Sequence, residues 1–311
     1  MTLSNSAVVA RARVLRGVRG ELDDLVGSKA DVVGSMVGLK LRGGRATQQL
    51  GVTYFVRTKL PKSEIVPRRR VPTRLRVGNS FVATDVVEWP LMAEQALPNA
   101  TILFDGRLQG TLSCFGVSEA GTFGVTCAHC LTGVDGNPAT PTAVATFVNP
   151  PGQFVPVGQS VYLAYAPGTG GPRNFGYLDC GLFDLRDRVL AARAASGVKL
   201  ELVTDTLNLI GHHLVGVSAL NAPHSSGQRR NAQVIGVDAN ALGERCDLVL
   251  RVEPPGTFRG DSGMLWLTEH GQAAAIHARG EVMSGMHGSR LTTAMSAHRL
   301  PLALGVQLVI G

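Results

Sequence analysis

Short apolar segments separated by turns fill the sequence from residue 101 onward, and no helix-length connection lies between them. Segments of this length that are bounded by Gly, Pro and Asn are typical of β-strands. Many short strands at near-regular spacing, without crossover helices, favour antiparallel β-barrels. We therefore predict a mostly β chain. The expected strands are 109–115, 122–126, 143–148, 160–164, 200–203, 214–217, 232–237, 247–252, 264–267 and 272–277.

The first 95 residues have a different pattern. Apolar residues recur there at intervals of three and four and then alternate, which predicts a small α+β unit. The expected elements are a helix over 6–26, a hairpin over 32–56 that turns at Gly43-Gly44, and a strand over 84–88. With a linker over 89–100, we expect a basic N-terminal extension over residues 1–95 and a second domain over 96–311.

Basic charge is concentrated in this extension. It contains 16 basic and eight acidic residues, whereas the rest of the chain has 14 basic and 15 acidic residues. The run Arg68-Arg69-Arg70 has no interleaved aromatic residues and no DNA-binding motif beside it, so a solvated loop is favoured over a nucleic-acid site. An acidic protein partner is the alternative that the charge leaves open.

Residues suited to nucleophilic catalysis occur in a fixed order along the β-rich part. His129 follows an apolar segment, Asp179 begins another, and Ser262 lies between glycines in Gly260-Asp-Ser-Gly263. A serine hydroxyl needs a base to take its proton, and a carboxylate can orient that base. Each residue alone is common in turns and caps, but the three together, in the order His, Asp, Ser, predict a catalytic triad.

These residues and their flanks (Val125-Thr-Cys-Ala-His-Cys130, Leu178-Asp-Cys-Gly181 and Gly260-Asp-Ser-Gly263) resemble the trypsin/chymotrypsin-like serine peptidases. The N-terminal block is similar to that of a bacterial group related to the plant narrow-leaf protein, through Val37-Gly-Leu-Lys40, Lys59-Leu-Pro61 and Asp85-Val-Val-Glu88. The resemblance implies a double antiparallel β-barrel, with His129 and Asp179 in the first barrel and Ser262 in the second.

The resemblance also implies roles for neighbours of Ser262. Gly260 and Ser262 would donate their backbone N–H groups to an oxyanion hole, which needs a tight turn without Cβ obstruction. In secreted relatives, the residue at Asp261 pairs with a new N-terminus. Here we expect Asp261 to pair internally, and activation by cleavage or by a partner is the alternative.

The implied substrate pocket comprises Gly256, Thr257, Ala278, Arg279 and Gly280. Gly256 stands where the trypsin pattern has an aspartate, so cleavage after basic residues is not expected. Arg279 replaces an aromatic residue and could favour acidic side chains or face solvent. We expect a preference for small or apolar residues before the cleaved bond.

The five cysteines allow a second chemistry. Cys127-Ala-His-Cys130 has the C-x-x-C spacing of redox or zinc sites, but Cys180 and Cys246 are isolated and no βαβ pattern accompanies them. No metal or cofactor is therefore expected. Secreted relatives have a disulfide at the places of Cys114 and Cys130, whereas the odd cysteine number and the lack of a signal-peptide pattern predict free thiols in the cytoplasm.

The sequence predicts an intracellular serine endopeptidase that acts on proteins or peptides through an acyl-enzyme intermediate, and the resemblance implies a bacterial one. We expect no membrane span, and the extension could receive an activating partner. The alternative is a regulated scaffold, or pseudo-protease, that binds peptide at a strand edge without turnover.

Overall fold

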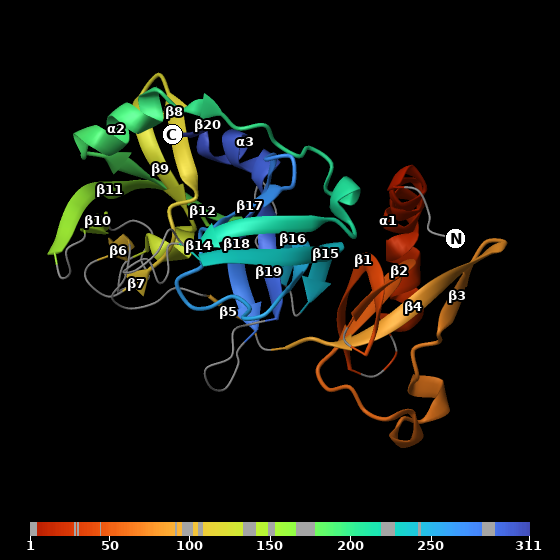
Figure 1. Ribbon diagram of the computed structural model, residues 1–311. Helices are drawn as coiled ribbons and strands as arrows, with labels where there is room; N and C mark the ends of the chain where they lie inside the picture. The colour runs from red at the N-terminus through yellow and green to blue at the C-terminus, as the bar shows by residue number, and fades with distance from the viewer. Residues whose placement is uncertain are drawn as a thin grey trace. The chain divides into compact units, whose positions relative to one another are not determined.

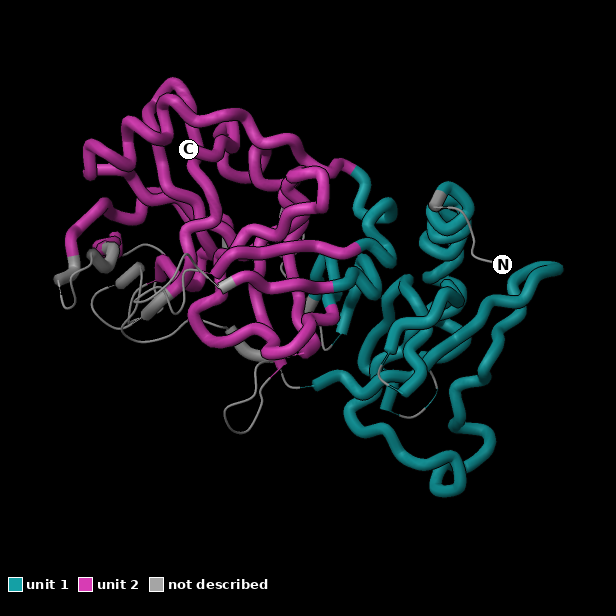
Figure 2. The backbone as a smooth tube through the Cα atoms, viewed as in Figure 1, with its two compact units in different colours: residues 1–91, 205–212, 233–250 teal, residues 92–204, 213–232, 251–311 magenta. Residues whose placement is uncertain are grey.

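A computed structural model gives the fold. It describes residues 5–27, 29, 31–43, 45–90, 92–94, 102–104, 108–132, 141–148, 153–165, 178–218, 228–241, 244–281 and 290–311. The chain forms two compact units. Unit 1 contains residues 1–91, 205–212 and 233–250, and unit 2 contains residues 92–204, 213–232 and 251–311 (Figure 2).

Unit 1 begins with the predicted helix, α1 (Asn5–Gly27), which buries the side chains of Ala12, Leu15 and Leu22. The predicted hairpin follows as β1 (Val32–Arg42) and β2 (Arg45–Val56). The remaining strands of the extension are β3 (Arg74–Val77) and β4 (Ser80–Glu88), and two 3-10 turns (Lys62–Glu64 and Pro67–Arg69) lie between β2 and β3 (Figure 1).

Two pairings join distant parts of the chain within unit 1. β4 pairs with β2 in parallel, and β1 pairs antiparallel with β15 (Gln228–Ala241), for example Val37 with Val237. Helix α1 also makes ion pairs with later residues of this unit. Arg13 lies 2.6 Å from Asp205, and Arg16 lies 2.5 Å from Asp238. The extension is therefore packed together with segments that follow it by some 200 residues in sequence.

Unit 2 contains a nine-stranded sheet in the order β13-β20-β8-β9-β12-β11-β10-β6-β7. Neighbouring strands of this sheet pair antiparallel. The strands are β6 (Ile102–Phe104), β7 (Leu108–Gln109), β8 (Cys114–Ser118), β9 (Gly121–Thr126), β10 (Ala143–Val148), β11 (Gln153–Tyr165), β12 (Asp179–Leu185), β13 (Val198–Lys199) and β20 (Gln307–Ile310). Helices α2 (Arg188–Ala195) and α3 (Leu300–Leu304) pack against this sheet.

A second group of strands in unit 2 runs β14-β17-β18-β19, with β5 on β18. These strands are β5 (Met92–Glu94), β14 (His213–Ser218), β17 (Leu265–Thr268), β18 (Ala273–Glu281) and β19 (Leu291–Ser296). Strand β16 (Glu244–Val252) precedes the segment that carries Ser262. A core of buried apolar side chains from both strand groups, including Val125, Leu182 and Ile276, fills the unit.

The predicted fold class is confirmed. The chain is mostly β, with a closed six-stranded barrel, a second sheet and an N-terminal helix. Two details differ from the prediction. The segment 109–115 is interrupted between β7 and β8, and residues 200–203 form only an isolated bridge, from Leu202 to Ala273. The division at residue 95 stays a prediction. No helix in the described part of the chain is long and apolar enough to cross a membrane.

Candidate active site

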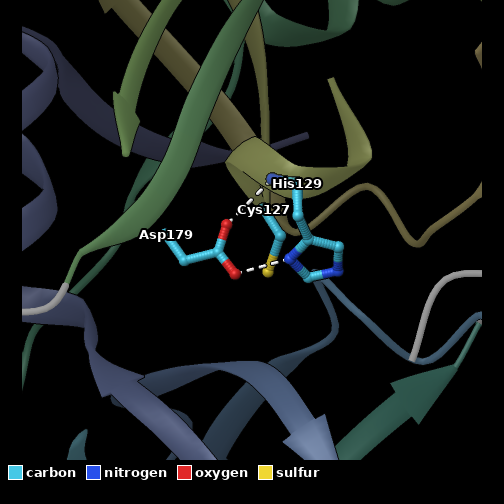
Figure 3. A group of neighbouring side chains, drawn as sticks. All are labelled: Cys127, His129 and Asp179. Carbon is cyan, nitrogen blue, oxygen red and sulfur yellow. Dashed lines mark hydrogen bonds and ion pairs between the residues drawn. The ribbon is translucent and has the colours of Figure 1, made fainter. Parts of the chain in front are cut away.

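The end of one strand and the start of its neighbour bring His129 and Asp179 together. β9 pairs antiparallel with β12, with Thr126 opposite Gly181, so the residues after β9 lie beside the first residue of β12. His129 lies on the short turn Ala128–Cys130, and its backbone N–H donates to Asp179 Oδ1 at 2.9 Å. Its Nδ1 lies 2.5 Å from Asp179 Oδ2 (Figure 3).

Ser262 completes this arrangement from the turn before β17. Its Oγ lies 2.9 Å from His129 Nε2 and 3.2 Å from the backbone carbonyl oxygen of Ala278. Both ring nitrogens of His129 are thus engaged, one by Asp179 and the other by Ser262. The structure brings together the three residues that the sequence predicts as a triad, all within unit 2.

The electrostatics of the pair favour a base held by a carboxylate. Burial alone would lower the pKa of His129, but the Asp179 carboxylate and the Cys130 thiol outweigh burial and raise that pKa well above 6.5. Burial would raise the pKa of Asp179, yet His129 and Arg279 hold it below its ordinary value. Asp179 is therefore held in its ionised form, and His129 is the member of the pair whose charge can change. This is the division of roles that general-base catalysis needs.

The turn around Ser262 depends on backbone conformations that favour glycine. Gly260 and Gly263 have φ angles of 97° and 91°. A Cβ on Gly263 would also collide with the carbonyl oxygen of Thr111 and with the Thr126 hydroxyl. Both glycines are thus required by the tight turn, as the sequence suggests.

Thr111 holds this turn from the neighbouring segment. Its N–H donates to Ser262 O at 2.7 Å, and its hydroxyl donates to Gly260 O at 2.9 Å. These bonds engage the carbonyl groups of the turn. In the described part of the chain, the N–H groups of Gly260 and Ser262 donate no hydrogen bond. Two N–H groups without partners beside a nucleophile are what an oxyanion hole requires.

Asp261 pairs internally with residues of unit 2, as we expected. Its carboxylate accepts from Arg230 Nε at 3.1 Å, from the N–H of Phe258 at 2.9 Å and from the Ser218 hydroxyl. Asp261 and Arg230 are both almost completely buried. Burial acts to raise the pKa of the Asp261 carboxyl, and the Arg230 guanidinium acts against it. The position next to Ser262 is therefore held by a cation from the same unit.

Sequence reasoning missed Thr111, Ser218 and Arg230. Arg230 stands in Arg229-Arg230-Asn231, which resembles an ordinary exposed polar stretch. Only the pairing of the strands shows that its side chain is buried. A threonine or serine that donates to a backbone carbonyl far away in sequence leaves no pattern, so these residues carry no signal that could have identified them.

The residues predicted to line the substrate pocket are all buried. Ala278, Arg279 and Gly280 lie on β18 next to Ser262, and Arg279 has 8% of its surface exposed. Gly256 and Thr257 lie in the segment that leads into the Gly260 turn. The burial of Arg279 does not fit a solvent-facing side chain. The role of these residues as pocket residues stays a prediction.

Cys127 lies beside His129 and Asp179, and its sulfur is within 4.8 Å of their potential metal-binding atoms (Figure 3). These donors are already engaged, however. The thiol donates to the carbonyl oxygen of His277 at 3.1 Å, and both oxygens of Asp179 accept from His129. Burial, followed by the charge of Asp179, raises the pKa of Cys127, which opposes the thiolate that a metal would need. The group fits a triad better than a metal site.

Comparison with solved structures finds matches to proteases. No protein-family profile matches the sequence, and no curated protein matches it. A glutamic acid specific serine protease is 14% identical over 68% of this chain and 99% of its own, with a TM-score of 0.42. The MamO protease domain from Magnetospirillum magneticum is 15% identical over 67% and 97% of the two chains, with a TM-score of 0.36.

The HtrA-type protease AlgW in complex with a tripeptide is 16% identical over 66% of this chain and 58% of its own, with a TM-score of 0.40.

Proposed function

We propose that the chain is a serine endopeptidase that uses Ser262 as nucleophile, His129 as general base and Asp179 as the group that orients the base. The observation that supports this most directly is the continuous contact from Asp179 Oδ2 to His129 Nδ1, at 2.5 Å, and from His129 Nε2 to Ser262 Oγ, at 2.9 Å. Distances in this range allow a proton to pass from the hydroxyl to the imidazole as the serine attacks.

In the proposed mechanism, Ser262 Oγ forms a bond to the carbonyl carbon of a peptide while His129 Nε2 takes its proton. The N–H groups of Gly260 and Ser262 stabilise the negative charge on the carbonyl oxygen. His129 then gives the proton to the leaving amine, and the C–N bond breaks to leave an acyl-enzyme. Water, deprotonated by His129, releases the acyl group.

The substrates in this proposal are proteins or peptides. We keep small or apolar residues as the preferred residue before the cleaved bond, because Gly256 adds no charge to the predicted pocket. The proposal also includes an activating partner that binds the N-terminal extension. It places the protein in the cytoplasm of a bacterium. The odd number of cysteines supports a reducing compartment. Cell fractionation tests the location.

Labelling with a fluorophosphonate probe tests the proposal. The wild-type chain should be labelled at Ser262, and Ser262→Ala should not. Ser196→Ala, which changes an exposed serine on a helix C-terminus, is the matched control and should label like the wild type. Equal labelling of all three proteins would mean that another residue reacts. No labelling of any would favour the peptide-binding scaffold.

A further inference from the structure

The strand beside the nucleophile, β18, has one edge that leads directly past Ser262. β17 occupies the first part of this edge, with Leu265 opposite Ile276. The contacts then continue into the turn. The N–H of Gly263 donates to His277 O at 2.9 Å, and Ser262 Oγ lies 3.2 Å from Ala278 O. Beyond Ala278, the same edge extends away from the nucleophile.

The short strand β5 (Met92–Glu94) pairs with this distal part of β18. Glu94 lies opposite Arg279, Ala93 opposite Gly280 and Met92 opposite Glu281, in antiparallel register. β19 also pairs with Arg279 and Gly280, and a strand has only two hydrogen-bonding edges. β5 therefore occupies the edge that carries Ser262, in line with β17.

This position is the one that an extended substrate would need. Peptides commonly bind by adding a strand to an exposed sheet edge. A peptide on this edge of β18 has its backbone next to Ser262. The direction of β5 also fits, because it runs from Glu281 toward Arg279 and its carboxyl end is thus directed to Ala278. A segment of the chain itself pairs where an incoming peptide would pair.

We propose that β5 is a tethered occupant of the substrate edge and keeps other peptides off β18 until it is displaced. Its effect on catalysis rests on the proposed peptidase function, whereas its competition for the edge does not. A segment linked by a short connection competes at an effective concentration of about 1 mM. If the β5 segment itself binds the edge with an intrinsic Kd of about 0.1 mM, it raises the apparent KM of a competing peptide about tenfold.

The first experiment measures competition without requiring activity. A fluorescent peptide of residues 89–95 is titrated into three full-length proteins that all contain Ser262→Ala. They are the otherwise unchanged chain, Ala93→Pro with Glu94→Pro, and Glu94→Ala as control. Proline removes the N–H donors that a strand pairing needs. The peptide should bind the double proline protein at least tenfold more tightly than the other two.

A second variant is needed because the double proline protein could fail to fold. Residues 92–94 are replaced by three glycines, and circular dichroism checks each protein. N–H groups of a strand alternate between its two edges, so only alternate amides of residues 279–281 face β5. Hydrogen exchange of those amides should be faster in both disrupted proteins than in the Glu94→Ala control, and exchange of the amides that face β19 should be unchanged. Unchanged exchange of the amides that face β5, or equal peptide binding by all folded proteins, would overturn the proposal.

A third measurement addresses the consequence for catalysis in proteins that retain Ser262. With fluorescent casein as probe, the double proline protein should show an apparent KM about tenfold lower than the wild type, with kcat changed less than twofold. An unchanged KM alongside improved peptide binding would overturn the blocking role. Absence of casein cleavage in every protein, with the binding difference intact, would count against the peptidase function and leave the tethered occupant supported.

Discussion

Two buried aspartates flank the candidate active site, and they differ in their partners. Asp179 faces His129, whose charge changes with protonation, whereas Asp261 faces Arg230, whose charge does not change. Both carboxylates are inaccessible to solvent, and each also accepts a hydrogen bond from a backbone N–H. The two carboxylates thus have similar burial and similar hydrogen bonds, but only the partner of Asp179 can gain or lose a proton.

This difference suits the Asp179–His129 pair to proton transfer and the Asp261–Arg230 pair to holding the local geometry. A carboxylate beside an imidazole can stabilise the imidazolium that forms during reaction. A carboxylate beside a guanidinium cannot participate in such an exchange, because arginine remains protonated. Asp261 instead holds the turn of Ser262 in place. Each of the following changes is expected to affect one side of this comparison more than the other.

The largest expected effect is that of Asp179→Asn on catalysis. Asparagine keeps the shape of the side chain but cannot stabilise the imidazolium, so kcat should fall about 10⁴-fold. The melting temperature should change far less. Asp184→Asn on the same strand, where Asp184 pairs at 2.9 Å with Arg186 near the surface, is the control and should retain activity. Loss of less than tenfold in Asp179→Asn, measured by stopped assay on casein, would contradict the proposed role.

Arg230→Met should mainly reduce stability. It leaves the Asp261 carboxylate buried without its cation, which costs about 3–5 kcal/mol in the free energy of unfolding. Arg229→Met, one residue earlier and exposed, should cost less than about 0.5 kcal/mol. Urea titration measures both.

A double variant tests whether the charge itself causes that loss. Adding Asp261→Asn to Arg230→Met removes the unpaired charge, so a good part of the lost stability should return. If the stability lost in the double variant equalled the sum of the losses in Arg230→Met and Asp261→Asn, the two side chains would contribute independently. The pairing of Asp261 with Arg230 would then not explain the loss.

The dependence of activity on pH should reflect the Asp179–His129 pair and not the Asp261–Arg230 pair. His129 must be neutral to accept the proton of Ser262, and its pKa is raised above 6.5 by Asp179 and Cys130 against the opposing effect of burial. Activity should therefore be high at alkaline pH and fall as pH decreases, about tenfold per unit below that pKa. The rate of fluorophosphonate labelling against pH measures it. A midpoint below 6.5 would contradict the raised pKa.

The same contrast explains how far sequence reasoning could go. His129, Asp179 and Ser262 stand in flanks that are themselves informative, a strand end, a strand start and a glycine turn, so their proximity could be predicted. Strand pairing decides which exposed-looking residues are buried. Arg230 therefore became recognisable as a partner of Asp261 only in three dimensions.

Strand order limited the prediction in a second place. Residues 89–100 were expected to be a linker, because Pro90, Pro98 and Asn99 are typical of one. Residues 92–94 of this segment form β5, on the edge of β18, while residues 95–100 lie outside the described residues. Three residues are too few to give a periodic pattern, and their pairing depends on an edge that β17 leaves uncovered. Composition alone could not have revealed it.

The smallest expected effect is that of Thr111→Val. This change removes the hydroxyl that donates to Gly260 O at 2.9 Å and keeps the N–H that donates to Ser262 O. Loss of one such bond costs about 1 kcal/mol. Because the bond holds the turn that presents the oxyanion N–H groups, kcat/KM should also fall about fivefold.

Thr84→Val provides the matched control for this last change. Thr84 is a buried threonine of unit 1, and its hydroxyl likewise donates to a backbone carbonyl, that of Pro72. It should lose similar stability in urea titration without losing activity. Equal kinetics in the two variants would mean that the turn at Gly260 does not depend on Thr111. A selective loss of kcat/KM in Thr111→Val would place Thr111 with Arg230 among the residues that hold the geometry around Ser262 and take no part in proton transfer.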